Sequence, residues 1–150
     1  SCPQCTPCIA ILRRYLPGER RSHQPHFDLQ AYVTVVIALN PDKVKGGLYL
    51  QATDSPLSRQ HFKLKAGDIL AHQFDLNHGV SVLEGRRYSA IAWFKREPDS
   101  CTAGTAPWIQ ESAEAGNADA QFNYGQLVSG GVGRAKQDHA VARDWFTKAA

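Results

Sequence analysis

Apolar residues recur along the first two thirds of the chain in short runs that end at turn residues. The run Cys8–Tyr15 stops at Leu16–Gly18. The nearly continuous apolar run Ala31–Leu39 stops at Asn40–Asp42. Runs of this length, rich in β-branched residues and bounded by Pro, Gly and Asn, are typical of strands. The second run lacks polar alternation, which predicts a strand covered on both faces.

Six further segments show the same pattern of apolar runs that end at turn residues. A polar loop, Ala52–Gln60, separates two of them. The additional strands that we expect are Arg20–Asp28, Gly46–Gln51, His61–Lys65, Ile69–Phe74, His78–Leu83 and Arg87–Phe94. About eight short strands at regular spacing, with no helix among them, are typical of a β-sandwich or jelly-roll barrel. The predicted core is therefore a β-sandwich or a jelly-roll barrel.

The pattern changes after Glu97. Residues 98–107 are rich in Ser, Thr, Gly and Ala and predict a linker. From Trp108 onward, Ala, Glu, Gln, Lys and Arg at helical spacing indicate helices, with Asn117 and Asp138 as N-caps. Gly130–Gly133 separates two of these helices. The predicted fold class is mixed but mainly β, with a small α-helical segment at the end.

The helical segment contains an internal repeat. Trp108–Ala113 recurs as Trp145–Ala150, 37 residues later, and such a period indicates a helical solenoid. The segment resembles the Sel-one-like repeat, a relative of the tetratricopeptide repeat, at Ala115–Gln121, Tyr124–Gly125, Gly131–Val132, Gln137–Asp138, Ala142–Trp145 and Lys148–Ala150.

This resemblance implies paired antiparallel helices that bind a protein partner, with Ala120, Gly125 and Ala142 allowing close approach. One repeat is fewer than a solenoid usually needs, so we expect the protein to continue beyond Ala150. The expected organisation is a jelly-roll core over 1–97, a linker over 98–107 and the repeat over 108–150.

Composition and charge exclude some classes of function. Of 150 residues, 43% are hydrophobic and 21% are charged, as in ordinary globular proteins. The net charge of +3 is mild and the basic residues are scattered, so we expect neither a nucleic-acid partner nor a membrane partner. The chain contains no methionine, so we expect its true start to be missing. The compartment therefore stays unknown, with the cytoplasm slightly favoured.

The cysteines allow several interpretations. Cys2, Cys5 and Cys8 form a C-x2-C-x2-C run, and Cys101 lies far along the chain. A structural zinc or an iron–sulfur cluster would need a fourth ligand close to the run. We interpret the run as small residues that enter the first strand with reduced thiols. A metal site and disulfides stay open as alternatives.

The strongest candidate chemistry lies at the end of the expected strand Arg20–Asp28. Alternate side chains of a strand leave the same face, so His26 and Asp28 would point into one pocket. His78, from a distant strand, would complete a 2-His-1-carboxylate triad of the kind that holds non-haem Fe(II). His72 is the rival third ligand, although we expect it to face the side of the barrel or make an ordinary hydrogen bond.

The last predicted strand places a charge inside the barrel. On alternation, Arg87 shares a face with Ser89, Ile91 and Trp93, and Arg86 is exposed. A buried guanidinium is costly without an anionic partner, and its planar fork suits a carboxylate bound at two points. An anionic ligand is therefore expected in the barrel.

Together these segments resemble the Fe(II)- and 2-oxoglutarate-dependent dioxygenases of the prolyl 4-hydroxylase type over residues 9–97. The matching residues, in order, are Tyr15–Gly18, His26–Asp28, Gly46–Gly47, Lys65–Asp68, His78 and Arg87–Tyr88 through Trp93. The resemblance implies a double-stranded β-helix (jelly roll) core. It also implies that Fe(II), 2-oxoglutarate and O2 hydroxylate an unactivated C–H bond, with ascorbate as reductant.

The resemblance also implies roles for individual residues. His26, Asp28 and His78 would bind the iron and form the catalytic centre. Arg87 would pair with the distal carboxylate of 2-oxoglutarate, and Tyr15 would hydrogen-bond the cosubstrate or the substrate. Two further residues would belong to the cofactor pocket: Thr34 would line it and Trp93 would wall it.

The chain departs from the family pattern in ways that bear on the substrate. Ala38 stands where some members have a tyrosine, the connection from Asp28 to Thr34 is short, and the usual preceding helices are missing. A protein or peptide substrate recruited by the repeats is the first hypothesis. A small molecule or free amino acid is the second, and a non-catalytic repeat scaffold with a degenerate barrel is the third.

The remaining histidines and aromatic residues are given structural interpretations. His23 and His61 are expected to face solvent, and His139 to cap a helix end. The aromatic residues of the helical segment are expected in the solenoid core: Trp108, Phe122, Tyr124, Trp145 and Phe146.

Overall fold

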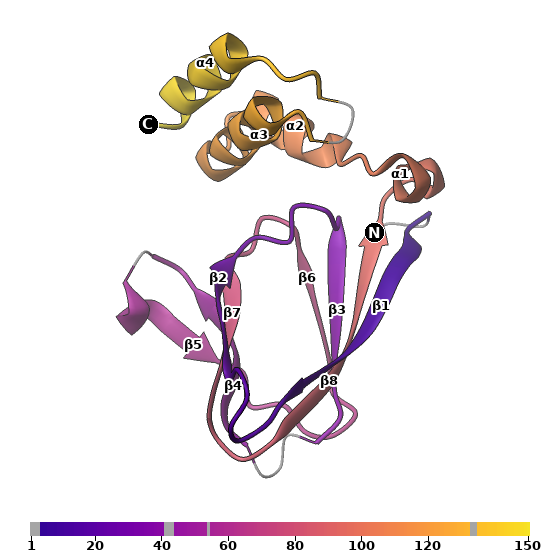
Figure 1. Ribbon diagram of the computed structural model, residues 1–150, viewed down its shortest axis with the longest axis vertical. Helices are drawn as coiled ribbons and strands as arrows, with labels where there is room; N and C mark the ends of the chain where they lie inside the picture. The colour runs from indigo at the N-terminus through magenta and orange to yellow at the C-terminus, as the bar shows by residue number, and fades with distance from the viewer. Residues whose placement is uncertain (1–3, 41–43, 54, 133–134) are drawn as a thin grey trace. The chain divides into compact units, whose positions relative to one another are not determined.

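A computed structural model describes residues 4–40, 44–53, 55–132 and 135–150 of the chain (Figure 1). The chain divides into two compact units. The barrel unit comprises Pro7–Asp28 and Val33–Phe94, and the helical unit comprises Ser1–Thr6, Leu29–Tyr32 and Lys95–Ala150.

The barrel unit consists of two four-stranded sheets that face each other, as Figure 1 shows. The order in the first sheet is β1 (Thr6–Tyr15), β8 (Arg87–Lys95), β3 (Val33–Ala38) and β6 (Ile69–Gln73). The order in the second sheet is β2 (Ser22–His26), β7 (His78–Glu84), β4 (Lys45–Gln51) and β5 (Arg59–His61), with the 3-10 turn η2 at Pro56–Ser58. The predicted mainly β, jelly-roll class of architecture is confirmed.

The interior of the barrel unit follows from alternation along the strands. In β3, Thr34, Val36 and Ala38 are buried, whereas the intervening residues are only half-buried. The prediction that this strand is covered on both faces is therefore wrong, because an antiparallel sheet buries one face against the core and leaves the other partly open. The apolar core comprises Tyr15, Val36, Leu48, Val80 and Val82.

Strand β2 ends earlier than expected. It stops at His26, and its pairing with β7 shifts register between His23 and His26. Pro25 lies in this interval and has no N–H to donate to the ladder, which accounts for the irregularity. Asp28 therefore follows the strand, and simple alternation does not bring it beside His26. Strand β5 also differs, since it comprises Arg59–His61 instead of the segment after His61.

The cysteines are bonded rather than reduced. Cys5, Cys8 and Cys101 are disulfide-bonded, and no cysteine in the described part of the chain is free. The interpretation of Cys5 and Cys8 as reduced thiols is thus wrong, and Cys2 lies outside the described residues. Disulfide bonding could not be predicted from the sequence, because Cys101 is distant along the chain from the C-x2-C-x2-C run. Disulfides persist in oxidising compartments, which removes the reason for favouring the cytoplasm.

The helical unit contains α1 (Pro98–Ala103), α2 (Pro107–Glu114), α3 (Ala118–Gly130) and α4 (His139–Ala149). Helix α1 lies in the segment that was expected to be a linker. It forms because Pro98 occupies the first turn, where its missing N–H costs nothing, and Gly104 ends the helix with a φ of 66°. None of the helices among the described residues is long and apolar enough to cross a membrane.

The helix boundaries of α3 and α4 confirm the predicted caps. The side chain of Asn117 accepts a hydrogen bond from the Ala120 N–H, and Asp138 accepts from the Ala140 and Val141 N–H groups. These contacts satisfy backbone donors that the first turn of a helix leaves unpaired.

Small and aromatic residues set the packing within the helical unit. A Cβ on Gly125 would lie 2.7 Å from the Phe146 ring, so α3 and α4 approach closely at this glycine, as expected. Trp108 is buried in α2. Phe122 contacts Phe146 but is 49% exposed, so its assignment to the core is wrong. The Sel-one-like repeat itself stays a prediction.

Candidate metal centre

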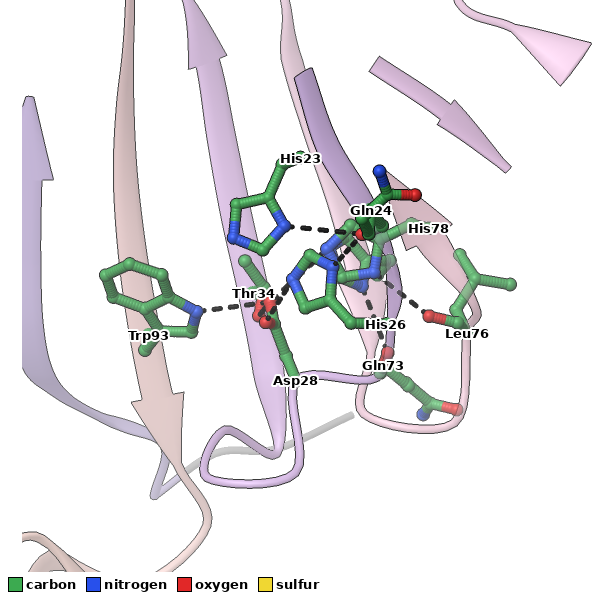
Figure 2. A network of polar contacts seen from close by, with 10 residues as sticks. His23, Gln24, His26, Asp28, Thr34, Gln73, Leu76, His78 and Trp93 are labelled. Atoms are coloured by element: carbon green, nitrogen blue, oxygen red, sulfur yellow. Dashed lines mark hydrogen bonds and ion pairs between the residues drawn. The ribbon is translucent and has the colours of Figure 1, made fainter. Parts of the chain in front are cut away.

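Three side chains meet at the junction of β2 and β7 (Figure 2). His26 ends β2, His78 begins β7, and the two residues are paired in the antiparallel register. Asp28 Oδ1 lies 3.4 Å from His26 Nε2, and Asp28 Oδ2 lies 3.6 Å from His78 Nε2. The three ligand atoms all lie within 4.8 Å of one another. The structure thus brings together the three residues that the sequence selected.

Backbone carbonyls fix the orientation of both imidazoles. His26 Nδ1 lies 2.8 Å from the Gln24 carbonyl oxygen, and His78 Nδ1 lies 3.0 Å from the Leu76 carbonyl oxygen. A carbonyl oxygen only accepts, so each Nδ1 carries the proton and donates it. Each Nε2 then directs a lone pair toward Asp28. This is the tautomer that a metal requires of a histidine bound through Nε2.

The Asp28 carboxylate is held by donors from the opposite sheet. Its Oδ2 accepts hydrogen bonds from Thr34 Oγ1 at 2.6 Å and from Trp93 Nε1 at 3.1 Å, both visible in Figure 2. Thr34 and Trp93 are paired neighbours on β3 and β8. Sequence reasoning placed both residues at the pocket and missed their contact with Asp28. Their shared register was the signal that could have revealed it.

The electrostatics favour an ionised Asp28 beside a neutral His78. Burial raises the pKa of Asp28, but hydrogen bonds with His26 and Thr34, and the nearby His78, outweigh burial and hold the pKa well below its usual range. Burial and then the adjacent His72 lower the pKa of His78 to about 4. Neutral His78 beside ionised Asp28 is therefore the state at neutral pH.

The donor set fits a divalent transition metal. Ligands about 2.1 Å from an ion and at right angles to each other are about 3 Å apart. The separations of 3.4 and 3.6 Å measured from Asp28 approach that value. Two imidazole nitrogens and one carboxylate oxygen on one face match the non-haem Fe(II) type and leave other positions open.

His72 faces the centre, contrary to expectation. It is paired with Thr34 across β6 and β3, which turns both side chains inward. Its ring centroid lies 4.1 Å from that of His78, and its Nε2 is buried 3.9 Å from Asp28 Oδ2 without a hydrogen-bond partner. The expectation that it faces the side of the barrel is wrong, although its Nδ1 does contact the Gln73 carbonyl oxygen at 3.0 Å.

Arg87 is the interior arginine that alternation predicted. It is 7% exposed, and its Nη1 donates a hydrogen bond to Ser89 Oγ at 3.0 Å. Its guanidinium lies 5.7 Å from the centre of the buried Tyr15 ring. Burial lowers the pKa of Arg87. Among the described residues no carboxylate pairs with this charge, so the position suits an anion from outside the chain.

One cavity in the barrel unit connects these groups. All seven residues selected from the sequence line it: Tyr15, His26, Asp28, Thr34, His78, Arg87 and Trp93. Arg13 and His23 also line it. Sequence reasoning missed Arg13, and the expectation that His23 faces solvent is wrong. Arg13 is two residues before Tyr15 in β1, so strand alternation was sufficient to place it inward.

Comparison with known proteins gives a likeness of structure. No protein-family model matches the sequence, and no curated protein matches it. An oxidoreductase of the 2OG-Fe(II) oxygenase family from Burkholderia pseudomallei superposes with a TM-score of 0.52 and 18% sequence identity, over 62% of this chain and 44% of that one. The chain shares the fold of this oxygenase.

Two further solved structures show weaker likeness. The protein EvdMO1 gives a TM-score of 0.49 at 19% identity, over 61% of this chain and 27% of its own. The non-heme alpha ketoglutarate dependent epimerase SnoN from nogalamycin biosynthesis gives 0.43 at 20% identity, over 57% of this chain and 44% of its own. The chain spans less than half the length of each of these three proteins.

Proposed function

We propose that this chain is the core of an Fe(II)- and 2-oxoglutarate-dependent dioxygenase that hydroxylates an unactivated C–H bond. The observation that carries the proposal is the meeting of His26, Asp28 and His78 in the same cavity as the unpaired, buried Arg87. A metal triad and an anion-binding arginine are the two requirements of this chemistry. The fold shared with a 2OG-Fe(II) oxygenase supports it.

The residues of the chain would divide the work. His26 Nε2, an Asp28 oxygen and His78 Nε2 would hold Fe(II), and Arg87 would bind the distal carboxylate of 2-oxoglutarate at two points. The Tyr15 ring would pack beside that carboxylate. Thr34 and Trp93 would keep the Asp28 carboxylate in its ligating orientation and limit its rotation.

Iron bound at this centre would supply O2 activation, coupled to oxidation of 2-oxoglutarate. Overall, substrate C–H, O2 and 2-oxoglutarate give substrate C–OH, succinate and CO2, and ascorbate would keep the iron reduced. The buried walls around Arg87 and Tyr15 would exclude bulk water, which strengthens the interaction of the guanidinium with its carboxylate.

The substrate follows one of two alternatives. A prolyl 4-hydroxylase-like reaction on a protein would give the helical unit, with its Sel-one-like repeat, the role of recruiting the target. Hydroxylation of a small molecule is favoured by the connection between Asp28 and β3, which comprises only Leu29–Tyr32. A connection of this length offers little backbone to cover a peptide.

The test is succinate formation from 2-oxoglutarate in the presence of Fe(II), ascorbate and O2. We expect turnover by the full-length protein and its loss in His78→Ala. His139→Ala is the matched control, because His139 is an exposed histidine in the helical unit. Absence of turnover in folded, iron-loaded protein, or equal turnover in His78→Ala, would exclude the oxygenase and favour the scaffold hypothesis.

A further inference from the structure

Two consecutive arginines of β1 have opposite environments. Arg14 points outward, and its Nη2 pairs with Glu19 Oε1 at 2.9 Å on the surface. Arg13 points inward, is half-buried and lines the same cavity as the metal triad. Its Nε is buried without a hydrogen-bond partner. Strand alternation explains the difference in direction, but among the described residues none accepts a hydrogen bond from the inward Arg13 Nε.

The cavity therefore contains two guanidinium groups. Arg87 would be matched by the distal carboxylate of 2-oxoglutarate, whose other carboxylate would lie at the metal. In the part of the chain that the structure describes, Asp28 is the carboxylate that lines this cavity. Its Oδ2 already accepts two hydrogen bonds, and it would serve the metal. Among the described residues, no carboxylate therefore remains to pair with Arg13, even when the cosubstrate is counted.

His23 adds a second polar group beside Arg13. Its ring centroid lies 4.2 Å from that of the proposed ligand His26, and its Nδ1 lies 3.3 Å from the Gln24 carbonyl oxygen. Its Nε2 is thus the nitrogen available to a ligand. With the Nδ1 proton directed at that carbonyl oxygen, Nε2 is the acceptor, so the pair offers a cationic fork and a hydrogen-bond acceptor.

We propose that Arg13 is the substrate-binding arginine and that the substrate carries a carboxylate. The substrate carboxylate would accept two hydrogen bonds from the Arg13 guanidinium. An N–H or O–H group of the substrate next to that carboxylate would donate a hydrogen bond to His23 Nε2. This inference rests on the proposed oxygenase function and specifies its substrate class. The short connection Leu29–Tyr32 favours a free carboxylic acid, such as an amino acid, over an acidic side chain of a peptide.

The partial exposure of Arg13 allows the substrate to bind after the cosubstrate. Its side chain is only half-buried, whereas Arg87 is 7% exposed. The less buried arginine can be reached after the cosubstrate is in place. A carboxylate anchored there would hold the rest of the molecule near His26, since His23 connects the two positions.

The test uses the full-length protein with free L-amino acids, the matching L-amino acid amides, and aspartyl peptides with blocked termini as probes. We expect at least one free acid to stimulate succinate formation, and its amide to fail. In Arg13→Ala the KM for that acid should rise about tenfold or more, because a charged hydrogen-bonded pair is lost, while the KM for 2-oxoglutarate stays within about twofold. Arg13→Lys should recover part of the effect, and Arg14→Ala should match the wild type.

Other outcomes overturn the inference. An increase in the KM for 2-oxoglutarate in Arg13→Ala would assign Arg13 to the cosubstrate, and equal stimulation by acids and amides would exclude recognition of a carboxylate. Stimulation by blocked aspartyl peptides alone would exclude the free-acid form. Uncoupled turnover that no carboxylate stimulates would leave the oxygenase intact and refute this inference alone.

A binding measurement separates the inference from the oxygenase reaction. If no turnover occurs, calorimetric titration of the same acids into zinc-loaded protein still tests Arg13. Binding that is lost in Arg13→Ala and retained in Arg14→Ala would support the carboxylate site without the oxygenase. Absence of binding, together with absence of turnover, would refute both the carboxylate site and the oxygenase.

Discussion

Replacing Thr34 with valine should weaken the metal centre without altering any proposed ligand. The substitution removes the 2.6 Å hydrogen bond to Asp28 Oδ2 and leaves only the longer bond from Trp93. A hydrogen bond to a charged group contributes about 1.5–3 kcal/mol. Supporting contacts of this kind usually change metal affinity by about 10–100-fold. We therefore expect the dissociation constant for Co(II) to rise by about 10–100-fold in Thr34→Val.

The assay is anaerobic titration of Co(II), followed by its visible absorption. Thr34→Ser is the matched control, because it keeps the hydroxyl and should bind Co(II) nearly as the wild type does. Trp93→Phe should give a smaller loss, and the double variant should show coupling, since both donors share one oxygen. Unchanged affinity in folded Thr34→Val would refute the role of Thr34 in holding Asp28.

Three further predictions concern the barrel unit. Burial lowers the pKa of His26, but its hydrogen bonds with Asp28 and the Gln24 carbonyl raise the pKa by more, and a metal needs the neutral ring. Mn(II) affinity measured by calorimetry should thus fall about tenfold per pH unit below the raised pKa and level off above it, and a flat profile would contradict this. His72→Leu should keep Mn(II) affinity within about threefold, because the triad is complete without His72. The same substitution should raise the free energy of unfolding by about 1 kcal/mol, because it removes a buried nitrogen that has no hydrogen-bond partner. Gly79→Ala should lower the free energy of unfolding in urea by about 1–3 kcal/mol, because its Cβ would collide with the Tyr49 hydroxyl and lie 2.7 Å from the His23 carbonyl oxygen. Wild-type stability would show that both Tyr49 and β2 can move aside.

The sequence predicted much of the fold because strand alternation and turn residues are local signals. The segments that became β3, β7 and β8 were located to within a few residues, and the caps Asn117 and Asp138 were identified from side-chain chemistry alone. The short helix α1 was missed because Ser, Thr and Gly suggest a linker, while Pro98 at its first turn gives little signal. Disulfide bonding stayed an open alternative because cysteine partners are set by tertiary structure.

The sequence predicted which site side chains point into the barrel, but it did not predict all of the contacts that they make there. Alternation placed Arg87 inside, and the resemblance placed His26, Asp28 and His78 in one cavity. Alternation within β2 was nevertheless the wrong reason for the proximity of His26 and Asp28, because the strand ends at His26. The inward position of His72 depends on the register between β3 and β6, which the sequence does not encode locally.

Asp28 connects the two halves of the barrel unit. Its carboxylate accepts hydrogen bonds from β3 and β8 of one sheet and lies against histidines of β2 and β7 of the other. An ion bound there would fasten the sheets to each other much as a cross-link does. At a free metal concentration 100 times the dissociation constant, such binding adds about 2.7 kcal/mol to the free energy of unfolding. The lifetime of the protein under proteolysis would then follow the supply of iron, so that scarcity removes the idle protein as well as its activity.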